Sequence, residues 1–193
     1  MARKYTLLTK GVFNEILNGA GILLKSFDPT GETQVSTDDI LCDTTGDITV
    51  TCVPTYSDMG EDVNNCPNGV MELMNLDHWE NRIAFTALNF TLETTHLSLG
   101  AADIDTETGK VTPRSTLDTT KDFKDVWLVV DKGSKKGFVA IHLKNALSTA
   151  GLSITTTKTG KGQLQIELSG HVSVSKPDEV PLEIYVSEDD EAA

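Results

Sequence analysis

The most constraining feature of the sequence is an alternation of apolar and polar residues across 163–174. The apolar positions are Leu164, Ile166, Leu168, Val172 and Val174. Successive side chains of a β-strand point to opposite faces, so a period of two indicates a strand with one buried face and one wet face. The preceding segment 151–157 and the connection TTKTGKG predict a hairpin with this strand.

Other short segments rich in β-branched and apolar residues also predict strands. They are 20–27, 46–53, 81–92, 125–131, 137–144 and 182–188. A helical pattern is confined to 92–100, where Leu92, His96 and Leu99 share one face and Gly100 is a natural stop.

These elements predict a mainly β protein with a single domain over residues 1–193. We expect a β-sandwich or barrel of two packed antiparallel sheets with one short flanking α-helix. We also expect a long inter-strand loop at 54–80 and extended terminal arms at 1–18 and 176–193.

Charge is distributed unevenly along a chain whose net charge is −13. Residues 26–81 contain twelve acidic residues and no Lys or Arg, and residues 178–193 contain seven and none. Sequence-specific nucleic-acid binding needs a basic patch, so this class is disfavoured. No apolar run approaches the roughly 20 residues of a membrane helix. We read no signal peptide at the N-terminus and expect a cytoplasmic origin.

Two cysteines, Cys52 and Cys66, bracket the carboxylates Asp58, Glu61 and Asp62. Three interpretations are open: a metal site, a disulfide-closed loop, or a loop that contacts another subunit. The segment lacks the alternating oxygen ligands and the final bidentate Glu of a calcium loop. The total of three cysteines is odd and includes no CxxC pair, which favours free thiols. We expect free, packed cysteines, no metal and no cofactor.

No residue set predicts catalysis, so we expect that the protein is not an enzyme. The four histidines lack HxxxH spacing, and GKG at 160–162 lacks the rest of a phosphate loop. SVSK at 173–176 ends a strand rather than starting a helix. One alternative is a monomeric β-sandwich binding or adhesin module, which predicts an exposed aromatic platform.

Four stretches, in order along the chain, carry a resemblance to a known family. They are YSDMGEDVNNCPNGVMEL with a following WE, LETTHLSLGAADID with GKVTPR, DFKDVWLVV with GFVAIHLKNALSTAGLSI, and TKTGKGQLQIELSGHVS at 157–173. Over residues 5–186 the chain resembles the major tail (tail tube) proteins of long non-contractile-tailed bacteriophages. That family is also similar to the inner-tube proteins of contractile tails and of type VI secretion. The acidic tail SEDDEAA shows no such pattern.

The resemblance implies a subunit that forms hexameric rings, which stack into a tube for genome delivery. The implied partners are other copies of the chain, a tape-measure protein, and tail-completion and tail-tip proteins. DNA is expected to pass through the lumen without specific binding, and no membrane is involved. The implied location is the virion tail, after synthesis in the host cytoplasm.

Three groups of residues are expected to serve assembly. We expect a lumen-lining polar face, for which an outer solvated face is the open alternative: Thr155, Thr157, Gln163, Gln165, Glu167, Ser169 and His171. We expect the 54–80 loop to gain order against an adjacent ring through Asp58, Glu61, Asp62, Val70, Leu73 and Leu76. We expect oppositely charged ends to dock between subunits, with Arg3, Lys4 and Lys10 at one end and Glu188, Asp189 and Asp190 at the other.

Overall fold

The computed structural model describes residues 11–31, 35–133 and 137–187. Its large sheet contains nine strands: β1 (Leu17–Leu24), β2 (Ile40–Cys42), β3 (Thr44–Asp58), β4 (Met74–Ala87), β7 (Lys124–Lys132), β8 (Phe138–Ser148), β9 (Ser153–Thr155), β10 (Gln163–Gly170) and β11 (Leu182–Val186). A second sheet pairs β5 (Ala102–Asp105) with β6 (Lys110–Pro113). The helices are α1 (Val12–Glu15) and α2 (Leu92–Leu99), and 3-10 turns span Thr37–Asp39 and Met71–Leu73.

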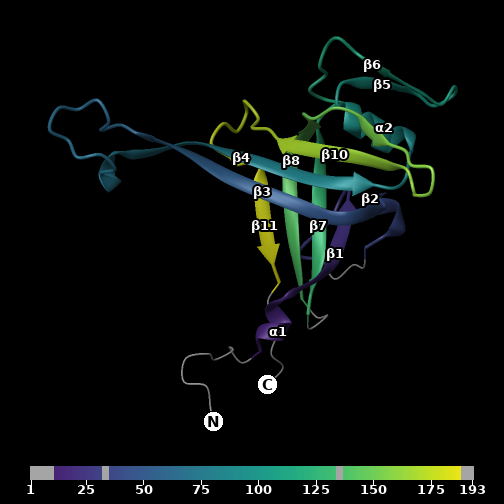
Figure 1. Cartoon of the computed structure of the whole chain (residues 1–193), viewed down its shortest axis with the longest axis horizontal. Coiled ribbons are helices and arrows are strands. Elements are labelled where there is room, and N and C mark those ends of the chain that lie inside the picture. Colours follow the sequence, from purple (N-terminus) through teal and green to yellow (C-terminus); the bar gives the residue numbers. More distant parts are fainter. Residues whose placement is uncertain (1–10, 32–34, 134–136, 188–193) are drawn as a thin grey trace.

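The large sheet folds over so that two of its parts face each other (Figure 1). The strand order is β2-β1-β7-β8-β10-β4-β3, with β11 added to β8 and β9 added to β10. Every pairing is antiparallel. β8 and β10 pair only over 146–148 and 168–170, where the sheet turns from one layer to the other. The mainly β fold is therefore confirmed, with both layers belonging to one hydrogen-bonded sheet.

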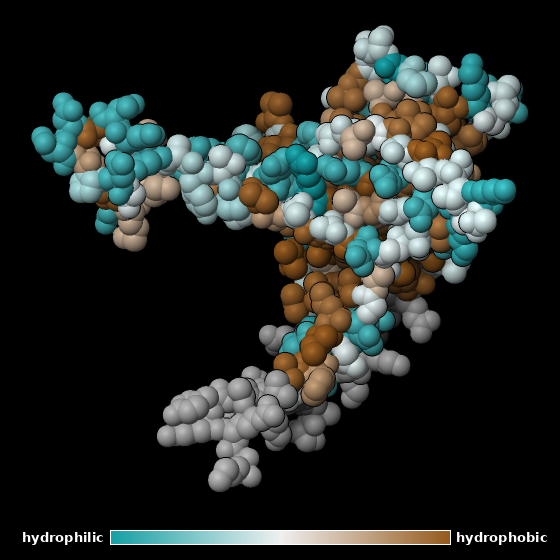
Figure 2. All heavy atoms as spheres, viewed as in Figure 1, coloured by the Kyte–Doolittle hydropathy of each residue, from teal (hydrophilic) through white to brown (hydrophobic). Residues whose placement is uncertain are grey.

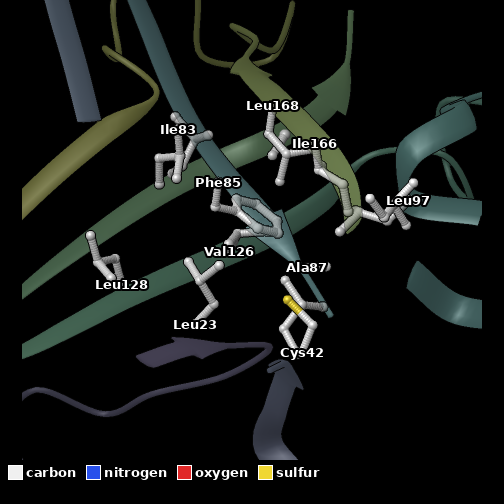
Figure 3. Close-up of a cluster of buried hydrophobic side chains, with 14 of the residues drawn as sticks. Leu23, Cys42, Ile83, Phe85, Ala87, Leu97, Val126, Leu128, Ile166 and Leu168 are labelled. Atoms are coloured by element: carbon white, nitrogen blue, oxygen red, sulfur yellow. The ribbon is translucent and has the colours of Figure 1, made fainter. Parts of the chain in front are cut away.

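The main core lies between the two layers (Figure 3). β4 and β10 contribute Ile83, Phe85, Leu164, Ile166 and Leu168 from one layer. β1, β7 and β8 contribute Leu23, Val126, Leu128 and Leu143 from the other. The alternation in β10 arises here, because Leu164, Ile166 and Leu168 are buried while their neighbours face away from the core.

β7 lacks this alternation because both of its faces are covered. Its residues 126–130 are all buried. Val126, Leu128 and Val130 belong to the main core, while Trp127 and Val129 join a second cluster on the opposite face. The segment DVWLVVD is a continuous apolar run, and such a run is typical of a strand that is covered on both faces.

α2 packs between the large sheet and the β5–β6 hairpin (Figure 1). The predicted helix is confirmed, and Gly100 follows it. Its buried residues are Thr94, Leu97 and Ser98, whereas Leu92, His96 and Leu99, which share another face, are half-buried. A capping box explains this difference in part: the Thr91 and Thr94 side chains each accept a hydrogen bond from the other's backbone N–H, and this places Thr94 inside.

The structureless loop predicted at 54–80 is wrong. Residues 44–58 and 74–87 form one long hairpin, and only 59–70 and a 3-10 turn connect its strands. Pairing within the chain therefore organises most of the segment. The predicted terminal arms also contain regular structure, because Leu17 and Asn18 begin β1 and Leu182–Val186 is an edge strand on β8.

Candidate assembly surfaces

The distal half of the β3–β4 hairpin projects from the sandwich as a two-stranded arm (residues 51–81; Figure 1). β3 and β4 pair out to Asp58 and Met74, whereas β10 pairs with β4 only over 82–87. The strands therefore extend roughly 25 Å beyond the three-stranded region, at 3.3 Å per residue. Within the described residues, both outer edges of the arm have unpaired backbone groups. Such edges are templates for pairing with another chain.

The connection at the end of the arm, called the tip (59–73), is held in shape by Asp58. One carboxylate oxygen accepts the Gly60 N–H at 2.8 Å, and the other accepts the Gly69 N–H at 2.8 Å. These two bonds lower the pKa of Asp58, the Gly69 bond more strongly. Gly60 sits so close to the side chains of Leu73 and Cys66 that a Cβ there would clash. The tip is thus a small folded unit.

The outer surface of the tip combines apolar and acidic side chains. Met59 and Met71 are 67% and 80% exposed, and Val63 is also exposed. The acids Glu61, Asp62 and Glu72 are exposed around them. The whole arm contains six acidic residues and no Lys or Arg. Figure 2 shows the tip, at the left, as a largely hydrophilic end with small apolar areas.

The six residues expected to contact a neighbouring ring fall into two groups. Asp58 and Leu73 hold the tip together from within. Val70 is half-buried, while Glu61, Asp62 and Leu76 are exposed. Met59, Val63 and Met71, which were not among the residues predicted to make this contact, are also exposed on the tip. Apolar residues in an otherwise polar connection were the available signal for them.

The polar residues of β9 and β10 lie on the face of their layer that is turned away from the core. Thr155 and Gln163 pair side by side, and Gln165, Glu167 and Ser169 follow along β10. The neighbouring strands add small and polar residues, including Thr49, Ala84 and Thr86. We call this surface the outer polar face.

Two residues expected on that face lie elsewhere. Thr157 belongs to the exposed connection after β9. His171 follows the end of β10, and its ring packs edge-on against Phe123 at a centroid distance of 5.4 Å. The alternation in the sequence continues past Gly170, but the strand does not. Val172 and Val174 are consequently exposed, Val174 by 97%.

One cation on the outer polar face, Arg82, is held between two carboxylates. Its guanidinium lies 2.9 Å from Glu167 and also contacts Glu80 on its own strand. Glu80, first among the causes, and Glu167 raise the pKa of Arg82. Sequence reasoning missed this triad because Arg82 and Glu167 meet only through the pairing of β4 with β10.

The described parts of the two chain ends meet at Lys132. Its ammonium, almost fully buried, bonds to the Ser187 carbonyl at 2.8 Å and lies 3.2 Å from Glu15. A second network joins Lys144 on β8 to Glu179 and Glu183. The six charged residues expected to join the ends, at positions 3, 4, 10 and 188–190, lie outside the described residues.

All three cysteines are free thiols. Cys42 is buried in the main core, Cys66 is half-buried in the tip, and Cys52 is exposed on the arm. The prediction of packed cysteines is therefore wrong for Cys52. In the described part of the chain, no group of three or more His, Cys, Asp or Glu side chains is arranged to hold a metal ion.

Aromatic side chains gather on the face of β7 and β8 that is turned away from the main core, where they are buried or half-buried. Trp127 stacks on His142 at a centroid distance of 3.9 Å and is only 8% exposed. Phe27 packs edge-on against Trp127 and Phe138. This arrangement is a second core rather than an open platform. Neither described helix has the length and apolar character needed to cross a membrane.

The sequence matches no model of a known protein family and no curated protein sequence.

Proposed function

We propose that the protein is a structural virion subunit that polymerises as stacked hexameric rings into a phage tail tube. The observation that carries this proposal is the arm. An exposed two-stranded ribbon with free edges and an apolar, acidic tip is a poor end state for a monomer, because free edges and exposed apolar side chains favour association. A neighbouring copy supplies the missing contacts.

A second exposed apolar surface, on β11, adds support. β11 is an edge strand on β8, and its Ile184 and Val186 are 58% and 56% exposed. Figure 2 shows apolar side chains gathered below the root of the arm, around β11. A subunit in a ring has a neighbour on each side, so it needs lateral contacts in addition to the arm, and β11 offers one such surface.

The outer polar face suits the lumen of such a tube. Duplex DNA carries one negative charge per roughly 1.7 Å of axis, and a wall rich in unpaired Lys or Arg grips it by releasing counterions. Here threonines and glutamines dominate, and Arg82 is neutralised by Glu80 and Glu167. In this proposal the lumen first encloses a tape-measure protein and then passes DNA without specific binding. The role is structural and needs neither catalysis nor a cofactor.

The test is the assembly state of the purified protein. We expect rings and tubes by negative-stain microscopy and a matching large species by light scattering. A variant with residues 56–77 replaced by Asn-Gly joins the paired residues Thr55 and His78 by a two-residue turn. We expect this variant to fold without stacking.

A matched control shortens the β5–β6 hairpin instead. Replacing residues 104–111 by Asn-Gly joins the pair Asp103 and Thr112 and should leave the tubes intact. A wild-type protein that remains a monomer at all concentrations would contradict the tail-tube proposal and favour a binding module.

A further inference from the structure

The end of the molecule opposite the tip carries a surface of the opposite charge. The connection between β9 and β10 contains the exposed Lys158 and Lys161 and no acidic residue. Leu152 and Ile154 precede this connection in the same hairpin and are 41% and 50% exposed, and Phe90, which lies beside it, is 48% exposed. We call these five residues the lysine end.

Contacts within the chain place Ile154 and Phe90 beside the lysine-bearing connection. Ile154 pairs with Leu164, directly after the lysine-bearing connection. A Cβ on Gly162 would lie 3.5 Å from the Phe90 ring, so the ring lies beside that connection. The acid closest to Phe90 in sequence, Glu93, is already paired with Lys25 at 2.6 Å.

The register of β4 fixes the separation of the two surfaces. Its first residue, Met74, pairs with Asp58 beside the tip, and its last, Ala87, pairs with Leu164 beside the lysine end. Thirteen residue steps separate these pairs, or roughly 43 Å at 3.3 Å per step. The two surfaces therefore cannot meet within one copy, because a single rigid layer holds them apart.

We propose that the tip of one copy binds the lysine end of a second copy. This inference rests on the proposed tube, and it names the surface that receives the arm. The acids Glu61, Asp62 and Glu72 face the lysines, and exposed Met59, Val63 and Met71 pack against Phe90, Leu152 and Ile154. Opposite charges speed and orient the encounter, and the apolar contacts hold it.

Such a contact is head-to-tail, because two different surfaces meet. Each added copy then presents one free tip and one free lysine end, so the contact propagates as an open stack unless the rotation between copies closes it into a ring. Propagation along one direction is what the axis of a tube requires. It also gives the tube a polarity, with all tips pointing toward one end.

Charge reversal on each side tests the contact. We expect Lys158→Glu/Lys161→Glu and, separately, Glu61→Lys/Asp62→Lys to lower the polymer fraction at low salt at least about tenfold, because like charges then meet at every contact. The chain with all four substitutions restores opposite charges and should regain stacking. An equimolar mixture of the two double variants should also stack, which provides the same test if the fourfold variant does not fold.

Lys110→Glu/Lys121→Glu, which reverses two exposed lysines elsewhere, is the matched control and should stack as the wild type does. Stack length by microscopy and sedimentation are the readouts, and circular dichroism checks the fold. The inference is overturned if the wild type forms tubes and the lysine-end variant forms them equally well, or if neither the fourfold variant nor the mixture regains stacking. It is also overturned if the lysine-end variant loses only binding to duplex DNA. In each of these cases the tube itself still stands, whereas a monomeric wild type removes both proposals.

Discussion

Cys42 differs from the other two thiols in its chemical environment. Burial in the main core, with a smaller contribution from the charge of Asp43, raises the pKa of Cys42 to about 12. The thiolate is the reactive form, so the folded protein keeps this cysteine unreactive near neutral pH. Burial also raises the pKa of Cys52, but that side chain is open to solvent.

We therefore expect a thiol reagent to modify Cys52 and Cys66 in unassembled native protein and Cys42 only after denaturation. Counting reacted thiols with and without denaturant measures this difference. Cys42→Ser is the control, and it should remove the protected thiol alone. Modification of all three cysteines at one rate in native protein would contradict the buried position of Cys42.

Glu179 ties the segment before β11 to the sheet. Hydrogen bonds from Lys144 first, and then from Lys176, lower the pKa of Glu179 from 4.5 to about 2. A carboxyl whose pKa is lower in the folded state contributes stability above its unfolded pKa. That contribution is present above about pH 4.5 and is lost as the pH falls toward 2.

We expect Glu179→Gln to reduce the free energy of unfolding near neutral pH and to have little effect at the acid end of this window. Urea unfolding of both proteins across the window measures the difference. Asp62→Asn, on the exposed tip, is the control and should follow the wild type closely. An equal loss at every pH would mean that the amide disturbs packing rather than removing a charge.

At the scale of elements, burial decides what the sequence reveals. The strands at 125–131, 137–144 and 163–170 were predictable because a packed face imposes an apolar pattern on each. The arm was not predictable, because none of residues 51–58 and 74–80 is fully buried. Residues of β4 alternate between buried and exposed only from Asn81 onward, where β10 pairs nearby. Before that point, residues 74–78 are all exposed, and no period of two marks the strand.

The difference between patterns within one strand and pairing between strands explains which residues of the candidate surfaces were predictable. Gln163, Gln165, Glu167 and Ser169 were placed correctly on one face, because alternation within one strand determines them. Arg82 was missed, since a partner on another strand depends on register, which short-range patterns do not specify. The lysine end joins residues near 90, 152 and 160, which are brought together only by the folded chain.

The capping box of α2 makes a testable contribution to stability. The Thr91 hydroxyl accepts the Thr94 N–H at 3.1 Å, and the Thr94 hydroxyl accepts the Thr91 N–H at 2.9 Å. Loss of such a cap costs about 1 kcal/mol. We expect Thr91→Ala to lower the free energy of unfolding by about that amount in a denaturant titration.

Thr91→Ser keeps an oxygen at the cap and should retain most of the stability. Thr95→Ala, within the same helix, is the second control. If Thr91→Ala and Thr95→Ala have equal effects, the cap has no special role, and packing of α2 against the β5–β6 hairpin holds the helix in place.

The two ends of the molecule differ in both charge and shape. The acidic arm lies at one end of the β3–β4–β10 layer and the lysine end at the other, and the outer polar face lies between them. Residues 26–81 hold twelve acids and no base, and six of these acids lie in the arm. Three of them, Glu61, Asp62 and Glu72, are exposed on the tip, where the proposed tube needs an oriented contact.

The last prediction concerns the charge of the outer polar face. Glu80 and Glu167 neutralise Arg82, so replacing both by glutamine leaves one unpaired guanidinium per subunit on this face. Unpaired cations bind duplex DNA by releasing counterions, with an affinity that falls as salt rises. We expect assembled Glu80→Gln/Glu167→Gln to bind DNA at low salt more tightly than the wild type. Adding Arg82→Gln should return binding to the wild-type level. Fluorescence anisotropy over a salt series measures both effects, and a gain in binding that persists without Arg82 would show that the triad does not control this face.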